Sequence, residues 1–441
     1  MKILVSGEKD FSHFLQSFSR RGETGFEKVE RSVRNILEQV KERGDQALLR
    51  LIKKYDGWRA SINTLRVSAE EIRAAPKSLS HEERKVLEFA AERIERFHIL
   101  QQQKSWSFAE EDGTILGQIV RPMDRVGIYV PGGKAAYPSS VLMNAIPARI
   151  AGVPEIIMTC PAPRGHLNPA ILAAAHIAKV NAIFKIGGAQ AIAAMAFGTK
   201  IIPKVDKIIG PGNIYVAAAK RMVFGETSID SIAGPSEILI ISDGSGDPTF
   251  LAADLISQAE HDEQAAAVLL CTSKGFAEKV KRAISEQLAT LPRRQIAEQS
   301  LRDFGAILIV KNLSEAARIS NDLAPEHLEL AVANPFRLLE KIQNAGAIFL
   351  GHMSPETIGD YVAGPNHVLP TGGAARFSSP LGVYDFFKRS SLICLSPAGL
   401  KKLSQPGMTL AQMENLEGHR RAVEKRQGDR ISRHKLPPIA T

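Results

Sequence analysis

The run Ser257-Gln258-Ala259-Glu260-His261 brings together side chains that could hold a metal ion or a polar substrate at the end of a helix. The helix is expected to begin after Asp247, because Pro248 suits a first helical turn. At roughly 100° per residue, Gln258 lies about 20° from the apolar Leu251 and His261 about 80° from it, whereas Glu260 faces water. A buried amide without a partner costs about 1–3 kcal/mol. The pattern therefore predicts either a ligand-binding pair or a hydrogen bond between Gln258 and His261 at a fraying helix end.

A second candidate is the dipeptide Glu326-His327, which follows Pro325 just before a predicted strand. Neighbouring side chains of an extended chain point to opposite faces. The two cannot easily form one ion pair, but both can reach a cleft at the strand end. A partly buried glutamate suits a general base, and histidine carries protons near neutral pH. The alternative is a strand-entry turn with a solvated glutamate.

A polar loop is expected after the last predicted strand, in the runs Gly359-Asp360-Tyr361 and Gly364-Pro365-Asn366-His367. Asp360 could ligate a metal, and His367 could contact a substrate. An Asx-type turn without a ligand is the alternative.

Glu414 and His419 lie on the predicted terminal helix, five positions and about 140° apart around its axis. Together they could serve only a site that wraps around the helix end. Taken alone, they are typical of surface residues.

Glycine-rich turns could let the backbone approach a phosphate closely. The runs Gly187-Gly188-Ala189-Gln190 and Gly210-Pro211-Gly212-Asn213 lack the spacing of the G-x-G-x-x-G fingerprint, and the chain has no P-loop. They indicate a small-molecule site at a sheet edge or simply tight turns. Tyr129, at a strand end, could stack on a ring or belong to the core, and Gln190 enters a helix.

The elements that must position these residues alternate apolar strand-length runs with helical segments. Two series of strands are expected: 126–130, 156–160, 182–186 and 207–209, then 237–242, 266–271, 306–310, 328–332 and 347–350. Continuous apolar strands with helical crossovers predict parallel sheets covered on both faces, with ligands outside the carboxyl ends of the strands. The first 120 residues look mainly helical, apart from a short strand at 64–67. After Leu381 the chain looks helical and polar.

Composition limits the class of protein. A chain of 441 residues is long for a single hydrophobic core and suggests two or more domains. The 44% hydrophobic and 23% charged fractions are ordinary for a globular enzyme. The net charge of +9 is partly gathered near the C-terminus, but no aromatic residues interleave it, so no nucleic-acid partner is expected. No run approaches the length of a membrane span, and the N-terminus does not read as a signal peptide. Three scattered cysteines fit a reducing cytoplasm.

Several separate motifs, taken in order, resemble those of the histidinol dehydrogenase family over essentially the whole chain. The motifs are Val126-Gly127-Ile128-Tyr129-Val130-Pro131-Gly132-Gly133, Gly187-Gly188-Ala189-Gln190-Ala191-Ile192-Ala193, Gly210-Pro211-Gly212-Asn213, Ala233-Gly234-Pro235-Ser236-Glu237, Ser257-Gln258-Ala259-Glu260-His261, Pro325-Glu326-His327-Leu328, and Gly359-Asp360-Tyr361 through Thr371.

The resemblance implies roles for residues that match the motifs. One zinc ion per subunit, for which manganese is a possible substitute, is expected on Gln258, His261, Asp360 and His419. NAD contacts are implied for Tyr129, Gln190 and Asn213. Substrate contacts are implied for Ser236, Gln258, His261, His327, Asp360, His367, Glu414 and His419.

The implied reaction is the NAD-dependent four-electron oxidation of L-histidinol to L-histidine through histidinal. His327 would transfer protons, Glu326 would activate water, and zinc would orient the substrate. The family is homodimeric, so Glu414 and His419 are expected to complete the site of the partner subunit. The alternative is a relative within the superfamily that oxidises another primary alcohol, such as a sulfonated diol, to its acid.

The expected fold is α/β, with two Rossmann-like parallel-sheet domains, a helical N-terminal region and a helical C-terminal arm. Residues 1–120 are expected to pack on the second α/β domain, 121–235 to form the first, NAD-contacting domain, and 236–383 the second, which carries the metal and catalytic residues. Residues 384–441 are expected to form the arm, exchanged between subunits.

Overall fold

The computed structural model describes residues 1–19, 26–132, 136–232 and 234–427. The chain divides into two compact units, the first formed by Met1–Gln101 and Met123–Phe386 and the second by Gln102–Pro122 and Phe387–Thr441. Within the described residues, no helix has the length and apolarity that crossing a membrane requires.

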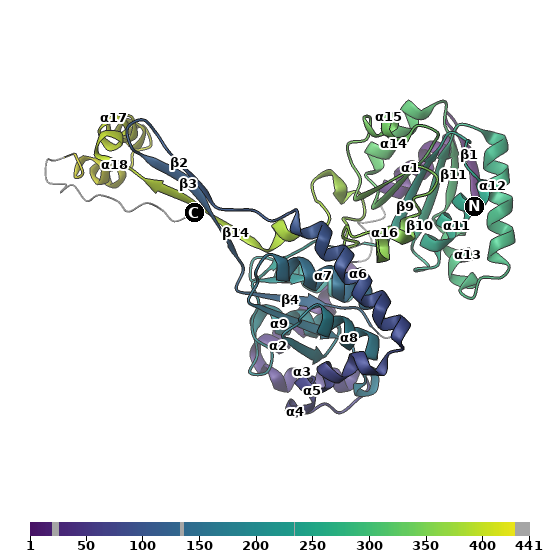
Figure 1. Ribbon diagram of the computed structural model, residues 1–441, viewed down its shortest axis with the longest axis horizontal. Coiled ribbons are helices and arrows are strands. Elements are labelled where there is room, and N and C mark those ends of the chain that lie inside the picture. The colour runs from purple at the N-terminus through teal and green to yellow at the C-terminus, as the bar shows by residue number, and fades with distance from the viewer. Residues whose placement is uncertain (20–25, 133–135, 233, 428–441) are drawn as a thin grey trace. The chain divides into compact units, whose positions relative to one another are not determined.

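The first unit contains two parallel sheets flanked by helices (Figure 1). The five-stranded sheet has the order β6-β5-β4-β7-β8. Its strands are β4 Arg125–Tyr129, β5 Glu155–Cys160, β6 Ala182–Lys185, β7 Lys207–Ile209 and β8 Ser228–Ile229. Its helices are α7 Pro138–Ile150, α8 Pro169–Ile177, α9 Gly188–Phe197 and α10 Ile214–Val223. The strand order reverses between β4 and β7, so the sheet has its switch point there.

The six-stranded sheet has the order β1-β11-β10-β9-β12-β13. Its strands are β1 Lys2–Val5, β9 Glu237–Ser242, β10 Ala266–Cys271, β11 Ala306–Ile309, β12 His327–Ala331 and β13 Ala347–Leu350. Its helices are α11 Pro248–Ala259, α12 Lys274–Leu288, α13 Arg294–Asp303, α14 Leu313–Leu323, α15 Pro335–Leu339 and α16 Glu356–Tyr361. Here the order reverses between β9 and β12. Both parallel sheets confirm the expected fold class.

The N-terminal region does not pack as one block on the second α/β domain. Strand β1 pairs with β11, and α1 (Lys9–Ser19) joins the core of the six-stranded sheet. By contrast, α2 (Phe26–Arg43) and α3 (Asp45–Tyr55) bury their apolar stripes against α9 and α10 beside the five-stranded sheet. The strand expected at 64–67 is also wrong. Ser61 and Thr64 form a reciprocal capping box that starts the short helix α4 (Ile62–Leu65).

The second unit begins its C-terminal part with a strand rather than a helix. Strand β14 (Phe387–Cys394) pairs antiparallel with β3 (Ile115–Pro122), which pairs with β2 (Trp106–Ala109). Helices α17 (Pro397–Met413) and α18 (Glu417–Glu424) follow. The purely helical arm expected after Leu381 is therefore wrong, because β14 is polar and mostly exposed and so lacks an apolar strand signature.

Candidate active site

A cavity of about 570 Å³ lies in the first unit and is lined from both of its sheets. The five-stranded sheet contributes the carboxyl ends of β4, β7 and β8, and the six-stranded sheet contributes the amino ends of β9, β10 and β12. The predicted site residues in its lining are Asn213, Ser236, Gln258, His261, Glu326, His327, Asp360 and His367. Tyr129 and Gln190 are buried but do not belong to this lining.

Helix α11 places Gln258 as the sequence predicts. Asp247 caps the helix by accepting from the Thr249 N–H, and Pro248 occupies the first turn. Gln258 is only 1% exposed, and its Oε1 atom has no hydrogen-bond partner. His261, just past the helix end, donates from Nδ1 to the Ser257 carbonyl at 2.9 Å. In the described chain the two side chains form no hydrogen bond with each other, so the alternative of a hydrogen-bonded Gln258–His261 pair is wrong.

Strand β12 opens on the Glu326-His327 pair, and both side chains are buried. Glu326 Oε2 accepts from the Glu237 N–H at 2.9 Å, and His327 Nδ1 donates to the Glu237 carbonyl at 3.1 Å. The neighbouring strand β9 therefore fixes both groups through one residue. The alternative of a solvated glutamate is wrong, and the Nε2 atom of His327 is left without a hydrogen-bond partner.

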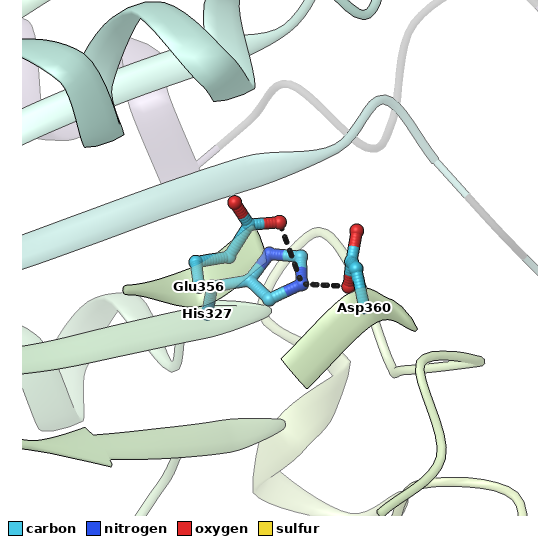
Figure 2. A group of neighbouring side chains, drawn as sticks. All are labelled: His327, Glu356 and Asp360. Carbon is cyan, nitrogen blue, oxygen red and sulfur yellow. Dashed lines mark ion pairs between the residues drawn. The ribbon is translucent and has the colours of Figure 1, made fainter. Parts of the chain in front are cut away.

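His327 faces two carboxylates on α16 (Figure 2). Its Nε2 atom lies 3.5 Å from Asp360 Oδ1 and 3.7 Å from Glu356 Oε1. Asp360 lies on this short helix, not in a loop. Glu356 was missed by the sequence analysis, although two carboxylates four positions apart on one helix share a face and could have signalled the site. One atom from each of the three side chains lies within 4.8 Å of the others, a grouping that could hold a metal ion.

The carboxylates change the acid–base properties of the site. Burial opposes protonation of His327, but Glu326, Asp360 and Glu356 raise the pKa of its imidazole to about 10. Burial raises the pKa of Glu326, and it raises that of Glu356 to about 8. Burial works against the ionised form of Asp360, yet the nearby imidazole of His327 lowers its pKa. The site thus concentrates negative charge where a cation or a proton would be held.

The carboxyl group of Glu329 supports the first turn of α16. Pro355 precedes the helix and offers no side-chain cap, and Glu329 on β12 accepts from the Glu356 N–H at 2.9 Å. Burial, followed by repulsion from Asp254, raises the pKa of Glu329 well above its ordinary value. The strand that carries His327 therefore also positions the helix that carries Glu356 and Asp360.

Buried polar atoms that lack hydrogen-bond partners indicate whether the site fits a metal. Among the described residues, Gln258 Oε1, His327 Nε2 and Glu356 Oε1 are buried without a hydrogen-bond partner. Such groups are costly unless a ligand satisfies them. Oxygen and imidazole nitrogen donors suit zinc and also manganese. The residues present fit the metal that the resemblance implies.

The remaining predicted residues occupy three settings. His367 is half-buried; its Nδ1 atom donates to the Asp360 carbonyl at 2.8 Å, and its Nε2 lies 3.4 Å from Ser140 Oγ. Tyr129 accepts from the Gly188 N–H at 3.1 Å. Glu414 and His419 belong to the second unit, where both are exposed.

Comparison with known proteins covers almost the whole chain. The histidinol dehydrogenase family model matches residues 19–427. Histidinol dehydrogenase of Syntrophotalea carbinolica is 56% identical over 97% of this chain and 100% of its own length. That of Geobacter sulfurreducens is 52% identical over 97% and 100%. The solved structure of histidinol dehydrogenase from Elizabethkingia anophelis has a TM-score of 0.91 at 37% identity and covers 97% of this chain and 98% of that one. The chain therefore belongs to the histidinol dehydrogenase family, and it is an oxidoreductase of histidine biosynthesis.

Proposed function

We propose that this protein oxidises L-histidinol to L-histidine in two NAD-dependent steps through histidinal. The observation that carries the proposal is the group of buried His327, buried Glu356 and half-buried Asp360 at a cavity lined from both sheets. Within the described residues, His327 Nε2 and Glu356 Oε1 have no hydrogen-bond partner. Family membership supplies the substrate class. The cytoplasm is the proposed location, supported by three cysteines that are free thiols.

His327 is the proposed proton acceptor of the first step. Its Nδ1–H is committed to the Glu237 carbonyl, so Nε2 is the atom that faces the substrate. In its neutral form, which a bound cation offsetting the nearby carboxylates would favour, His327 takes the alcohol O–H proton on Nε2, while the hydride on the same carbon passes to NAD and leaves the aldehyde. A fixed tautomer and ring orientation keep this acceptor within reach of the reacting hydroxyl.

Glu326 is the proposed base of the second step. Its Oε2 atom is held by the Glu237 N–H, which leaves Oε1 to take a proton from the water that attacks histidinal. The resulting hydrate loses a second hydride to a second NAD and becomes the carboxylic acid. Burial favours the protonated carboxyl and so strengthens Glu326 as a base.

Gln258, His261 and Asp360 are the proposed zinc ligands of this chain, with His419 of a second subunit as the fourth. The unpartnered Oε1 of Gln258 and the low pKa of Asp360 support the first and third of these. Bound there, zinc would supply an anchor for nitrogen atoms of the substrate and would offset the negative charge of the carboxylates. Ser236 and His367 complete the substrate contacts within this chain.

NAD is proposed to lie along the carboxyl edge of the five-stranded sheet. Asn213 lines the cavity at the end of β7, which supports its assignment. Tyr129 and Gln190 lie at the end of β4 and at the start of α9 in the same sheet. Ligands of open parallel sheets bind at such ends, next to the switch point.

A homodimer with shared sites is proposed from the second unit. Among its described residues, Ala411 is the sole apolar side chain that is buried. Its exposed large apolar side chains are Trp106, Phe108, Ile393, Leu395, Leu403, Leu410, Met413 and Leu416. Many exposed large apolar side chains on one small unit are typical of a protein interface. Glu414 and His419 lie beside several of these residues, so a partner seated on this unit would meet them.

A stoichiometric assay tests the reaction. The purified protein, supplied with L-histidinol and excess NAD, is expected to form two NADH and one histidine for each histidinol consumed. A chelator should abolish the activity, and added zinc should restore it. One NADH for each histidinol, or activity only with another primary alcohol, would contradict the proposal.

Mixing two inactive variants tests the shared site. His419→Ala and His261→Ala chains should each be inactive, whereas their mixture should recover about a quarter of the wild-type activity, because half of the randomly mixed dimers carry one intact site. Lack of recovery, with subunit exchange verified by mass spectrometry, would place His419 in the site of its own chain.

A further inference from the structure

Lys220 and Asp230 form a buried ion pair in the lining of the cavity, on the side of the five-stranded sheet. Lys220 lies on α10, and Asp230 follows β8 directly. Their side chains are only 2% and 5% exposed. Neither residue was singled out by its sequence context, and neither takes part in the proton transfers described above.

Both charges are directed at the backbone of Gly210. The ammonium group of Lys220 donates to the Gly210 carbonyl at 2.9 Å and to Asp230 Oδ1. The other oxygen of Asp230, Oδ2, accepts from the Gly210 N–H at 2.7 Å, and Oδ1 also accepts from the Ser231 N–H at 2.7 Å. The pair therefore holds the N–H and the carbonyl of one residue at the end of β7.

Gly210 could not be replaced by another residue without strain. Gly210 has a φ of +107°, and a Cβ atom at this position would overlap the Tyr129 carbonyl oxygen. Its backbone thus packs directly on the end of β4, across the switch point of the sheet. Fixing Gly210 fixes the start of the Gly210–Asn213 turn.

The turn ends at Asn213, which faces the cavity. Its Oδ1 caps α10 by accepting from the Tyr215 and Val216 N–H groups at 3.0 and 3.2 Å. Among the described residues the amide nitrogen of Asn213 has no acceptor, so it can donate to a bound ligand. Its position depends on the turn at one end and on α10, which carries Lys220, at the other.

We infer that the Lys220–Asp230 pair positions the Gly210–Asn213 turn for the dinucleotide. A buried ion pair rarely stabilises a fold more than apolar side chains of the same shape. What this pair provides is a fixed backbone geometry, with the hydrogen bonds of the turn already satisfied before the ligand arrives. The inference rests on the proposed function, in which NAD binds at this turn.

Two substitutions test the inference in the full-length enzyme. Lys220→Met removes the ammonium group at similar length, and Asp230→Asn keeps the shape but weakens both contacts. Each is expected to raise the KM for NAD roughly 10- to 100-fold, by analogy with the loss found for residues that orient metal ligands. The kcat at saturating NAD, the zinc content and the affinity for histidinol should stay near the wild-type values.

The matched control is Lys204→Met, which breaks the exposed Lys204–Glu226 ion pair on the same sheet. It should leave the KM for NAD unchanged. An unchanged KM for NAD in Lys220→Met and Asp230→Asn would overturn the inference. So would equal losses of zinc and histidinol binding, or failure of both variants to fold, because the pair would then serve only general stability. If the wild-type enzyme itself fails to use NAD, the proposed function falls instead.

Discussion

In the five-stranded sheet the cavity is lined from the carboxyl ends of β4, β7 and β8, beside the switch point between β4 and β7. In the six-stranded sheet the cavity is lined from the opposite edge, the amino ends of β9, β10 and β12. Both layers are parallel and helix-covered, so only one of them follows the rule that ligands lie at the carboxyl edge. Sheet topology alone therefore does not place a functional site.

The carboxyl edge of the six-stranded sheet is closed at its own switch point. Asp243 follows β9, and its Oδ2 accepts from the Ala333 N–H, beyond β12, at 3.0 Å. Its Oδ1 accepts from the Ser245 hydroxyl, which lies 3.1 Å from His352 Nε2. Asp243, Ser245 and the Nε2 atom of His352 therefore contact one another at this edge.

The two sheet edges that line the cavity contribute different chemical groups. The first sheet supplies backbone turns, in which glycine allows close approach at Gly210. The second supplies the buried titratable side chains of Glu326 and His327 to the lining, and Glu329 lies two residues farther along β12. The first edge suits a ligand held by main-chain and amide groups, and the second suits proton transfer.

The largest effect is expected at the titratable edge. His327→Asn should lower kcat by about 10²–10⁴-fold, the range of a general acid–base group, while zinc remains bound. His352→Asn, a histidine at the opposite edge of the same sheet, is the matched control and should retain full activity. Steady-state kinetics and metal analysis measure both. Loss of zinc from His327→Asn would contradict the division of roles between His327 and the ligands.

The carboxyl edge of the five-stranded sheet should be sensitive to a single added methyl group at Gly210. Gly210→Ala adds the strain of a positive φ, about 1–3 kcal/mol, and an overlap with the Tyr129 carbonyl. Gly225→Ala is the control, because Gly225 has a similar φ of +102° and no atom within 4 Å of an added Cβ. Thermal unfolding should separate the two variants, and NAD affinity should fall only in Gly210→Ala. Equal behaviour would mean that close packing at the switch point is not required.

A smaller effect concerns the pH dependence of stability, which should have opposite signs for Glu329 on β12 and for Glu315 at the carboxyl edge of the six-stranded sheet. The pKa of Glu329 is raised by burial, so its contribution to stability is present below the unfolded value near 4.5 and is lost as the pH rises through the folded value. Glu329→Gln mimics the protonated form and should raise the free energy of unfolding at pH 8 by about 1 kcal/mol.

The control for that experiment is Glu315→Gln at the carboxyl edge. A hydrogen bond from Ser6 lowers the pKa of Glu315, so its contribution is present above pH 4.5 and is lost as the pH falls. This variant should lose stability at pH 8 and approach the wild type in acid. Denaturant unfolding at several pH values measures both. Parallel pH profiles would show that the two edges do not differ electrostatically.

The smallest effect is expected at the closed switch point. Ser245→Ala removes the hydroxyl between Asp243 and His352 and should cost about 0.5–1.5 kcal/mol of stability without changing kcat/KM. A loss of activity would show that this edge also takes part in function.

Much of the scaffold could be predicted because its strands are continuous apolar runs. The predicted bounds of β7, β9, β10 and β13 agree with the structure, and β4, β5, β6, β11 and β12 differ by one residue at one or both ends. The strands β1, β2 and β3 were missed because residues 1–120 were expected to be mainly helical, although β1 (Lys2–Val5) is itself an apolar run. Two further missed strands lack that signature. β14 is polar and mostly exposed, and β8 has only two residues.

The site was predicted less completely, because its residues depend on contacts that no local pattern records. Gln258 was identified from its place on a helical apolar stripe. Glu356, by contrast, depends on α16 packing beside β12, and Lys220 depends on the approach of Asp230 from the next strand. Such pairings arise from tertiary structure and can be inferred from sequence only through relatives.

The edge strand β2 has a consequence for how the enzyme is made. Trp106 and Phe108 project from it with stacked rings whose centroids are 6.4 Å apart, and both are more than half exposed. An exposed aromatic edge can pair with any other extended segment that it meets. If the proposed dimer covers this edge, a newly made chain exposes an edge prone to association until it meets a second copy. The yield of folded enzyme in a cell should then depend on how quickly newly made chains encounter each other, and not only on how stable each chain is.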